Sequence, residues 1–220
     1  MNNLNLEHAR NNMIEQQLRP WEVIDDRVLN AMQSVPREDY VPEEYRHVAY
    51  ADVELPIGSG QKMLPPRIEG RALQALNIQP DDDVLVVGTG SGYLSAVIST
   101  LANRVTSVEV DSELAEKAQQ RLKSQGIDNI SIVVGDATRG LDDYAPYDAI
   151  AITGSVTEVP QLLLDNMHIG GRLFAVVGHA PAMQAVVITR INSGEWTTDH
   201  LFDTELLPLE NGTKSTLFTF

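Results

Sequence analysis

The chain has 220 residues, no cysteine and a formal net charge of −15. The negative charge disfavours nucleic acids and anionic membranes as partners, because both would repel an acidic surface, and the lack of cysteine excludes disulfides, cysteine-based zinc sites and cysteine nucleophiles. No apolar stretch approaches the roughly 20 residues of a membrane span, so we expect a cytoplasmic protein with one domain over residues 1–220.

Residues 1–67 are expected to form two helices followed by a functional loop. Apolar residues recur at helical spacing over 4–18 and again over 25–34, and Pro20 and Pro36 end the two segments. Residues 52–68 contain two glycines and three prolines, which predicts a loop rather than a regular element. We expect the two helices to cap the carboxyl edge of the sheet that follows and, with this loop, to close over a ligand.

From residue 68 to residue 220 the chain alternates between helical and strand patterns. Helices are expected over 68–76, 93–101, 112–125 and 159–167, with Ser112 as the N-cap of the third helix. Strands are expected over 83–88, 104–109, 130–134, 147–153, 171–177, 183–190 and 215–220. The alternation predicts a Rossmann-like α/β fold, with a mostly parallel seven-stranded sheet, helices on both faces and an antiparallel edge near the carboxyl terminus.

The strongest candidate binding site is the glycine-rich stretch Gly88-Thr-Gly-Ser-Gly92. It follows a predicted strand and opens a predicted helix, where glycine lets the backbone turn sharply and approach a ligand closely. Glu109 ends the next strand, 17 residues beyond Gly92, and its carboxylate suits a ribose diol. Asp136 follows the third strand, beside the small Ala137, and suits the edge of an adenine ring. Together these residues predict a nucleoside site at the carboxyl ends of parallel strands.

Each of these residues taken alone has other interpretations. The glycine pattern also fits a dinucleotide site or a plain tight turn. Glu109 could equally be a solvated residue at a strand end, and Asp136 an ordinary turn residue. No Lys-Ser or Lys-Thr pair follows the loop, which disfavours ATP hydrolysis. Tyr93 stands where a dinucleotide-binding loop has its third glycine, which disfavours a nicotinamide dehydrogenase. The five histidines are scattered without the spacing of metal ligands, so no metal is expected.

Short motifs on both sides of the glycine loop extend the pattern. They are Val35-Pro-Arg37, Val41-Pro-Glu-Glu44, His47-Val-Ala-Tyr-Ala-Asp52, Leu55-Pro-Ile-Gly58, Gly60-Gln61, Val87-Gly-Thr-Gly-Ser-Gly-Tyr93, Ser107-Val-Glu109, Gly135-Asp136, Ala145-Pro-Tyr-Asp148, Glu158-Val-Pro160 and Gly170-Gly-Arg-Leu173. By these motifs the chain resembles the protein-L-isoaspartate O-methyltransferase family from about residue 10 to about residue 210. The stretch from Pro56 to Gln61 is far more specific than the glycine loop, which indicates only the wider methyltransferase class.

The resemblance implies the S-adenosylmethionine methyltransferase form of the fold, with S-adenosyl-L-methionine as the cofactor. It implies methyl transfer to a carboxylate of a damaged aspartyl residue in a protein or peptide, giving an ester that collapses to a succinimide and starts repair. A carboxylate is already ionised at pH 7, so the transfer needs no general base. The residues that the resemblance assigns to the cofactor are Gly60, Gln61, Gly88, Thr89, Gly90, Ser91, Gly92, Tyr93, Glu109, Val110, Asp136, Ala137 and Thr153.

The chain departs from the family's pattern mainly on the acceptor side. Leu64 replaces a serine whose hydroxyl would touch the acceptor carboxylate, and Lys62 replaces a threonine of the same loop. Val86 stands where the family has an acid, two residues before the first glycine, and residues 155–157 differ from the usual Ala-Ala-Pro. Losing a hydrogen bond to a charged acceptor costs about 1.5–3 kcal/mol.

The departures leave three functional interpretations open. The chain is an isoaspartyl methyltransferase with a divergent acceptor loop, a methyltransferase of the same family on a different acceptor, or a non-catalytic descendant that binds S-adenosylmethionine. In the first interpretation Ser59, Lys62 and Leu64 form the acceptor site, and Lys62 or Arg67 draws in an acidic substrate. The sequence carries no signal for the oligomeric state.

Overall fold

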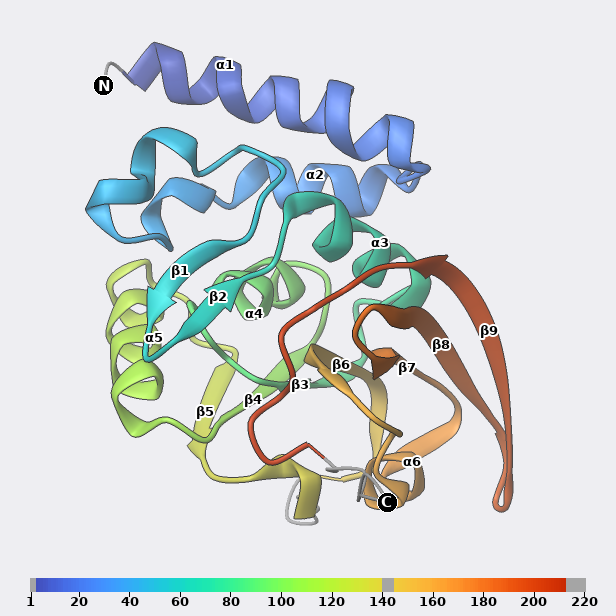
Figure 1. Ribbon diagram of the computed structural model, residues 1–220. Coiled ribbons are helices and arrows are strands. Elements are labelled where there is room, and N and C mark those ends of the chain that lie inside the picture. Colours follow the sequence, from blue (N-terminus) through green and yellow to red (C-terminus); the bar gives the residue numbers. More distant parts are fainter. Residues whose placement is uncertain (1–2, 140–144, 213–220) are drawn as a thin grey trace, which may run out of the picture.

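A seven-stranded sheet forms the centre of the molecule, and helices pack against both of its faces (Figure 1). The computed structural model describes residues 3–139 and 145–212. The strands stand in the order β5-β4-β3-β6-β7-β8-β9. The first five strands in this order are parallel, and β8 and β9 form an antiparallel edge. Their bounds are β3 Asp83–Val87, β4 Arg104–Glu109, β5 Ile130–Val134, β6 Tyr147–Val156, β7 Met167–His179, β8 Ala182–Asn192 and β9 Glu195–Asp203. The predicted fold class is confirmed.

The central strand β3 shows why the sheet is buried on both sides. Val84 and Val86 point to one face, where they join the hydrophobic cluster that contains the N-terminal segment and α4. Leu85 and Val87 point to the opposite face and join the cluster that contains α6. Because successive side chains of a strand alternate between faces, a continuous apolar run is what a strand covered on both sides requires.

The helices fall into a large group on one face and a small group on the other. Residues of α1 to α5 contribute to the first cluster, while Leu163 of α6 contributes to the second. No helix within the described residues is long and apolar enough to cross a lipid bilayer. The α-helices are α1 Asn3–Met13, α2 Asp26–Ser34, α3 Pro66–Leu76, α4 Tyr93–Ser99, α5 Ser112–Ser124 and α6 Gln161–Asp165. A short π-helix lies at Ile14–Leu18, and short 3-10 helices lie at Arg19–Trp21, Arg37–Asp39, Glu43–Val48 and Ala137–Arg139.

The helix α2 and the segment Ile14–Leu18 pack onto α3. A methyl group on Gly70 of α3 would lie 3.1 Å from a side-chain carbon of Leu18 and 3.1 Å from one of Val23. Such close contact between segments is possible only because residue 70 has no side chain.

The helix α5 differs in detail from the sequence prediction, since its N-cap is Asp111 and not Ser112. The Asp111 carboxylate accepts from the amides of Glu113 and Leu114, the second and third residues of the helix.

Residues 55–63 form a hairpin, where the sequence analysis expected a loop over 52–68. The strands β1 (Leu55–Gly58) and β2 (Gln61–Met63) pair antiparallel, with Leu55 opposite Met63 and both side chains buried. The turn between them has positive φ at Gly58, Ser59 and Gly60. The two glycines that argued against a regular element are therefore the residues that close the hairpin.

The edge of the sheet also differs from expectation. The seventh strand is β9 (Glu195–Asp203), which pairs with β8 along its length. The strand expected over 215–220 lies outside the described residues. Because β9 is an edge strand with most side chains exposed, it carries no apolar alternation by which the sequence would reveal it.

Candidate active site at the carboxyl ends of the strands

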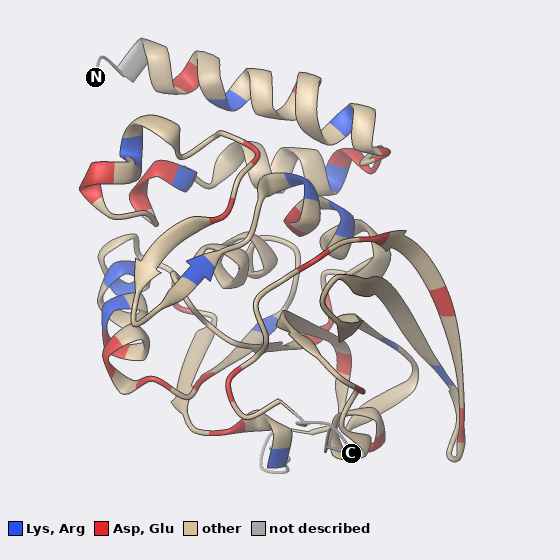
Figure 2. Cartoon of the chain, viewed as in Figure 1, with Lys and Arg blue, Asp and Glu red and all other residues tan. Residues whose placement is uncertain are grey.

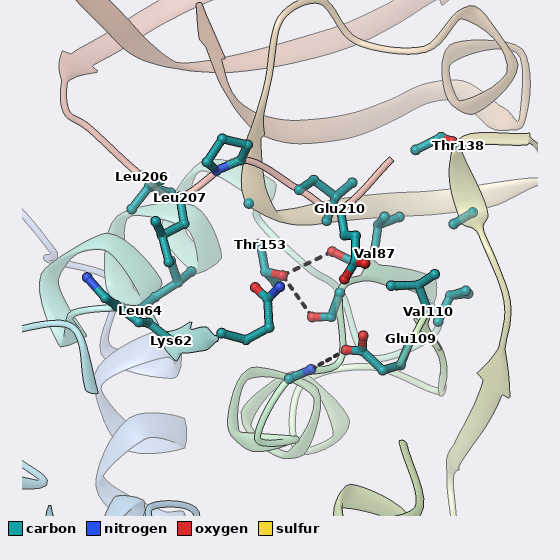
Figure 3. A pocket seen from close by; sticks show the side chains of 18 of the residues that line it. Lys62, Leu64, Val87, Glu109, Val110, Thr138, Thr153, Leu206, Leu207 and Glu210 are labelled. Carbon is teal, nitrogen blue, oxygen red and sulfur yellow. Dashed lines mark hydrogen bonds between the residues drawn. The ribbon is translucent and has the colours of Figure 1, made fainter. Parts of the chain in front are cut away.

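A cavity of about 710 Å³, including space open to solvent, lies at the carboxyl ends of β3, β4, β5 and β6. Figure 3 shows its lining, with Glu109 and Val110 on one side and Lys62 and Leu64 of the hairpin on the other. An open α/β sheet binds its ligands at this edge, because the loops that leave parallel strands meet there.

The glycine loop forms the floor of the cavity at the end of β3. Gly88, Gly90 and Gly92 all have positive φ, at 91°, 53° and 86°. A methyl group on Gly88 would collide with the Thr153 hydroxyl, and one on Gly90 would lie 3.1 Å from Ile57 Cδ1. The loop therefore needs glycine both for its backbone and for its neighbours.

The other members of the loop turn their side chains into the protein. The Thr89 hydroxyl bonds Ser107 at 2.7 Å, and the Ser91 hydroxyl accepts from the Tyr93 amide at 3.2 Å. Tyr93 is fully buried. Thr89 and Ser91 line a small hollow next to the main cavity, whereas Tyr93 lines neither. These residues shape the loop, and Gly88 and Gly90 line the cavity.

Glu109 at the end of β4 is held in place by two backbone amides. Its Oε2 accepts from the Gly90 amide at 2.8 Å and its Oε1 from the Asp111 amide at 3.1 Å. A carboxylate has about four acceptor positions, so two of them remain for a ligand. The residue is buried yet lines the cavity. Its orientation is thus set by the backbone before any ligand arrives.

Asp136 lies on the loop after β5 and caps the turn that follows. Its Oδ1 accepts from the Thr138 amide at 3.0 Å and from the Thr138 hydroxyl at 2.5 Å, and its Oδ2 pairs with Arg139 at 3.2 Å. Asp136 and Ala137 line the cavity next to Val110. An apolar wall beside a fixed carboxylate suits a flat ring with an exocyclic amine.

Thr153 in β6 holds the end of β3 in place. Its hydroxyl donates to the carbonyl of Gly88 at 2.8 Å and lies 3.1 Å from the carbonyl of Val87 (Figure 3). The side chain lines the cavity, but its one proton is already used within the protein. Thr153 therefore positions the glycine loop.

The hairpin supplies the opposite wall, where the acceptor loop was expected. Lys62 and Leu64 line the cavity, together with Gln61. Lys62 Nζ pairs with Glu54 Oε2 at 2.8 Å, and the two side chains are 40% and 26% exposed. Ser59 lies at the hairpin tip and does not line the cavity. The Ser59 side chain lies near the Asp111 carboxylate and lowers the pKa of that group.

A buried ion pair supports the hairpin from behind. Arg37 is fully buried and donates to Glu69, to the carbonyl of Leu64 and, at 2.8 Å, to the carbonyl of Ala49. Its guanidinium carbon lies 4.8 Å from the centre of the Tyr93 ring. Burial raises the pKa of Glu69 to about 7, although Arg37 acts in the opposite direction. The position of Leu64 is therefore anchored in the core.

Residues 206–210 also line the cavity, and the sequence analysis missed them. They follow β9 and pair with the end of β6, where Ser155 donates to the Leu207 carbonyl and Leu209 donates to the Ser155 carbonyl, each at 2.8 Å. The run Leu206-Leu207-Pro208-Leu209 is apolar but has no periodicity that would have marked it.

The expected cap over the cavity is wrong in one respect. None of the described cavity-lining residues comes from the N-terminal helices, which pack on α3 instead. The hairpin and residues 206–210 cover the cavity in their place. Five of the residues assigned to the cofactor do not line the main cavity, namely Gly60, Thr89, Ser91, Gly92 and Tyr93.

The model of the family described as Protein-L-isoaspartate(D-aspartate) O-methyltransferase matches residues 8–214 of the chain. A protein-L-isoaspartate O-methyltransferase of Koribacter versatilis is 42% identical over 204 residues, which cover 93% of this chain and 90% of that protein. One of Methanoculleus marisnigri is 42% identical over 181 residues and covers 82% of each chain.

Among solved structures, one from Plasmodium falciparum has a similar fold. It is described as a protein-L-isoaspartate O-methyltransferase in complex with S-adenosyl-L-homocysteine. The TM-score is 0.79 at 24% sequence identity, and the match covers 91% of this chain and 97% of that one.

Proposed function

The chain belongs to the protein-L-isoaspartate(D-aspartate) O-methyltransferase family, and on this premise we propose that it transfers the methyl group of S-adenosyl-L-methionine to the free carboxylate of an isoaspartyl residue in a protein or peptide. The observation that supports this most directly is the cavity between Glu109 and the hairpin. It joins a nucleoside-type site on the strand ends to a wall that carries Lys62 and Leu64.

The residues of the cavity fit the cofactor. Glu109 keeps two acceptor positions free for a ribose diol, and Asp136, with Val110 and Ala137, faces the place of an adenine ring. The backbone of Gly88 and Gly90 is open to the cavity for the methionine portion. When bound, S-adenosylmethionine supplies an electrophilic methyl group on a sulfonium sulfur.

The remaining task of the chain is to align the acceptor and exclude water. An isoaspartyl carboxylate is ionised at pH 7, so no side chain has to take its proton. Leu64 and Ile57 present apolar surface to the cavity, which keeps water from the place where acceptor and methyl meet. Holding the acceptor carboxylate in line with the methyl group then accounts for the acceleration of methyl transfer.

The setting of the reaction follows from composition. We propose that the protein acts in the cytoplasm, on protein rather than nucleic acid, with residues 1–220 working as one domain. The net charge of −15 supports the exclusion of nucleic acid.

Methyl transfer to a matched pair of peptides tests the function. The pair has one sequence, with isoaspartate or ordinary aspartate at a single position, and the methyl group of the cofactor is labelled. We expect label in the isoaspartyl peptide and none in its aspartyl twin. Binding of S-adenosylhomocysteine without transfer to either peptide would contradict the proposal.

One observation favours a second candidate, a methyltransferase of the same family with a different acceptor. Leu64 lines the cavity where the family's pattern has a serine, so a hydroxyl is missing at the acceptor wall. Transfer to a protein extract that lacks isoaspartate, with none to the isoaspartyl peptide, would select this candidate.

A further inference from the structure

Lys62 stands at the junction of three hollows. It lines the cofactor cavity, the small inner hollow that reaches Thr89 and Ser91, and an outer groove. The outer groove runs along the end of β6, the β7–β8 turn and residues 205–212, and it opens to solvent. A peptide that enters along the groove therefore reaches Lys62 before it reaches the cofactor.

Lys62 is also the one lysine or arginine among the described residues that line these hollows. Figure 2 shows that the hairpin carries a single basic position, in β2. The same linings contain Glu54, Glu205 and Glu210, in a chain with a net charge of −15. A substrate carboxylate would be repelled by these glutamates and attracted by the Lys62 ammonium group.

The hydroxyl and guanidinium groups near the acceptor wall do not replace Lys62, and Gln61, which lines the cavity beside it, is a neutral donor. Leu64 has no hydroxyl, Ser59 does not line the cavity, and the Thr153 hydroxyl donates to backbone carbonyls. Arg67 pairs with Asp52 and lies over the ring of Trp21, and it lines none of the three hollows. Lys62 has three N–H donors and pairs with a single carboxylate.

We infer that Lys62 binds the acceptor carboxylate and that Glu54 is its counter-ion only until substrate arrives. The inference rests on the proposed function. The Lys62–Glu54 pair is partly exposed, so it contributes little and exchanges readily for a carboxylate held by the rest of the peptide. Lys62 thereby binds the acceptor carboxylate through its positive charge, whereas the family's pattern has a hydroxyl at residue 64 for this role.

Steady-state kinetics of Lys62→Met, Lys62→Arg and Glu54→Gln on an isoaspartyl peptide test this, with Lys123→Met as the matched control. Lys123 is exposed at the end of α5 and lines none of the hollows, so its loss changes net charge alone. We expect Lys62→Met to raise KM about 10- to 100-fold, the loss of one charged hydrogen bond. Lys62→Arg stays within a few-fold of the wild type, and Glu54→Gln lowers KM about two- to fivefold.

Two further measurements separate substrate binding from other roles. The wild-type KM rises when salt is raised from about 0.05 to 0.5 M, whereas the KM of Lys62→Met does not, because salt screens the exposed charge. The affinity for S-adenosylhomocysteine, measured by calorimetry, is the same in all variants.

Each contrary result has a distinct meaning. An unchanged KM in Lys62→Met, or a fall in S-adenosylhomocysteine affinity that accounts for its defect, overturns the inference while the proposed function stands. A wild-type protein that methylates no isoaspartyl peptide overturns the proposed function, and the inference falls with it.

Discussion

The two walls of the cavity are built in different ways. The cofactor wall consists of strand ends in the parallel sheet, and its groups bond one another, as Glu109 bonds the Gly90 amide and Thr153 bonds the Gly88 carbonyl. The acceptor wall consists of a short hairpin and residues 206–210. The departures at Lys62 and Leu64 lie on the acceptor wall.

The difference shows where a fold of this kind tolerates change. A substitution on the cofactor wall disturbs groups that hold each other, whereas Lys62 pairs only with the partly exposed Glu54. The acceptor wall is nevertheless anchored at one point, since the buried Arg37 binds the carbonyl of Leu64. Substitutions in the cofactor wall, in the acceptor wall and at the anchoring residue Arg37 should therefore change different properties of the protein.

The largest expected effect is that of Arg37→Met. It leaves Glu69 buried without its cation and frees the Leu64 carbonyl, so we expect the free energy of unfolding to fall by about 3–5 kcal/mol. Denaturant unfolding measures this. Arg104→Met is the control, because Arg104 is half exposed in its pair with Asp83 and its loss should cost under about 1 kcal/mol. Equal losses in the two variants would contradict the anchoring role.

Glu109→Ala tests the cofactor wall. It removes the acceptor of two backbone amides and the proposed ribose ligand, so affinity for S-adenosylhomocysteine should fall about 100-fold. Calorimetry measures the affinity, and circular dichroism checks that the variant is folded. An affinity within threefold of the wild type would show that Glu109 does not contact the ligand.

Gly88→Ala tests how tightly the glycine loop is packed. The new methyl group meets the Thr153 hydroxyl at a residue whose φ is 91°, so stability should fall by about 1–3 kcal/mol. Gly194→Ala is the matched control, since no atom lies within 4 Å of its Cβ position and its φ is not in the left-handed region. Thermal unfolding of both variants gives the comparison, and similar midpoints would argue against a packed loop.

Leu64→Ser has the smallest expected effect on activity and tests the acceptor wall, although the loss of a buried leucine side chain also lowers stability. A hydroxyl restored at the cavity lining adds one donor for the acceptor carboxylate, so kcat/KM for an isoaspartyl peptide should rise about tenfold. Leu162→Ser, on the exposed side of α6, is the control. A fall in kcat/KM with unchanged cofactor affinity would mean that apolar surface at residue 64 matters more than a hydrogen bond.

The cofactor wall was predictable from the sequence, because its signals are local. The run 83–88 is a buried strand, the glycines follow it directly, and Glu109 ends the next strand. The topology of a parallel sheet then brings these ends together without further information. Their placement along one cavity agrees with that expectation.

The acceptor wall was not predictable to the same degree, because its contacts are long-range. The hairpin turn at Ser59 looks like a loop until Leu55 and Met63 are seen to pair. Leu207 reaches the site only by pairing with Ser155, 52 residues earlier in the chain. Nothing in the local pattern of residues 206–210 reports such a contact.

Cofactor binding at the cofactor wall is the central claim, and a calorimetric titration of S-adenosylhomocysteine into the wild-type protein tests this claim most directly. We expect one site per chain with a dissociation constant of about 10 μM or lower, equivalent to roughly −7 kcal/mol. Absence of binding at ten times that concentration would contradict the assignment of Glu109, Asp136 and the glycine loop, and with it the proposed methyl transfer.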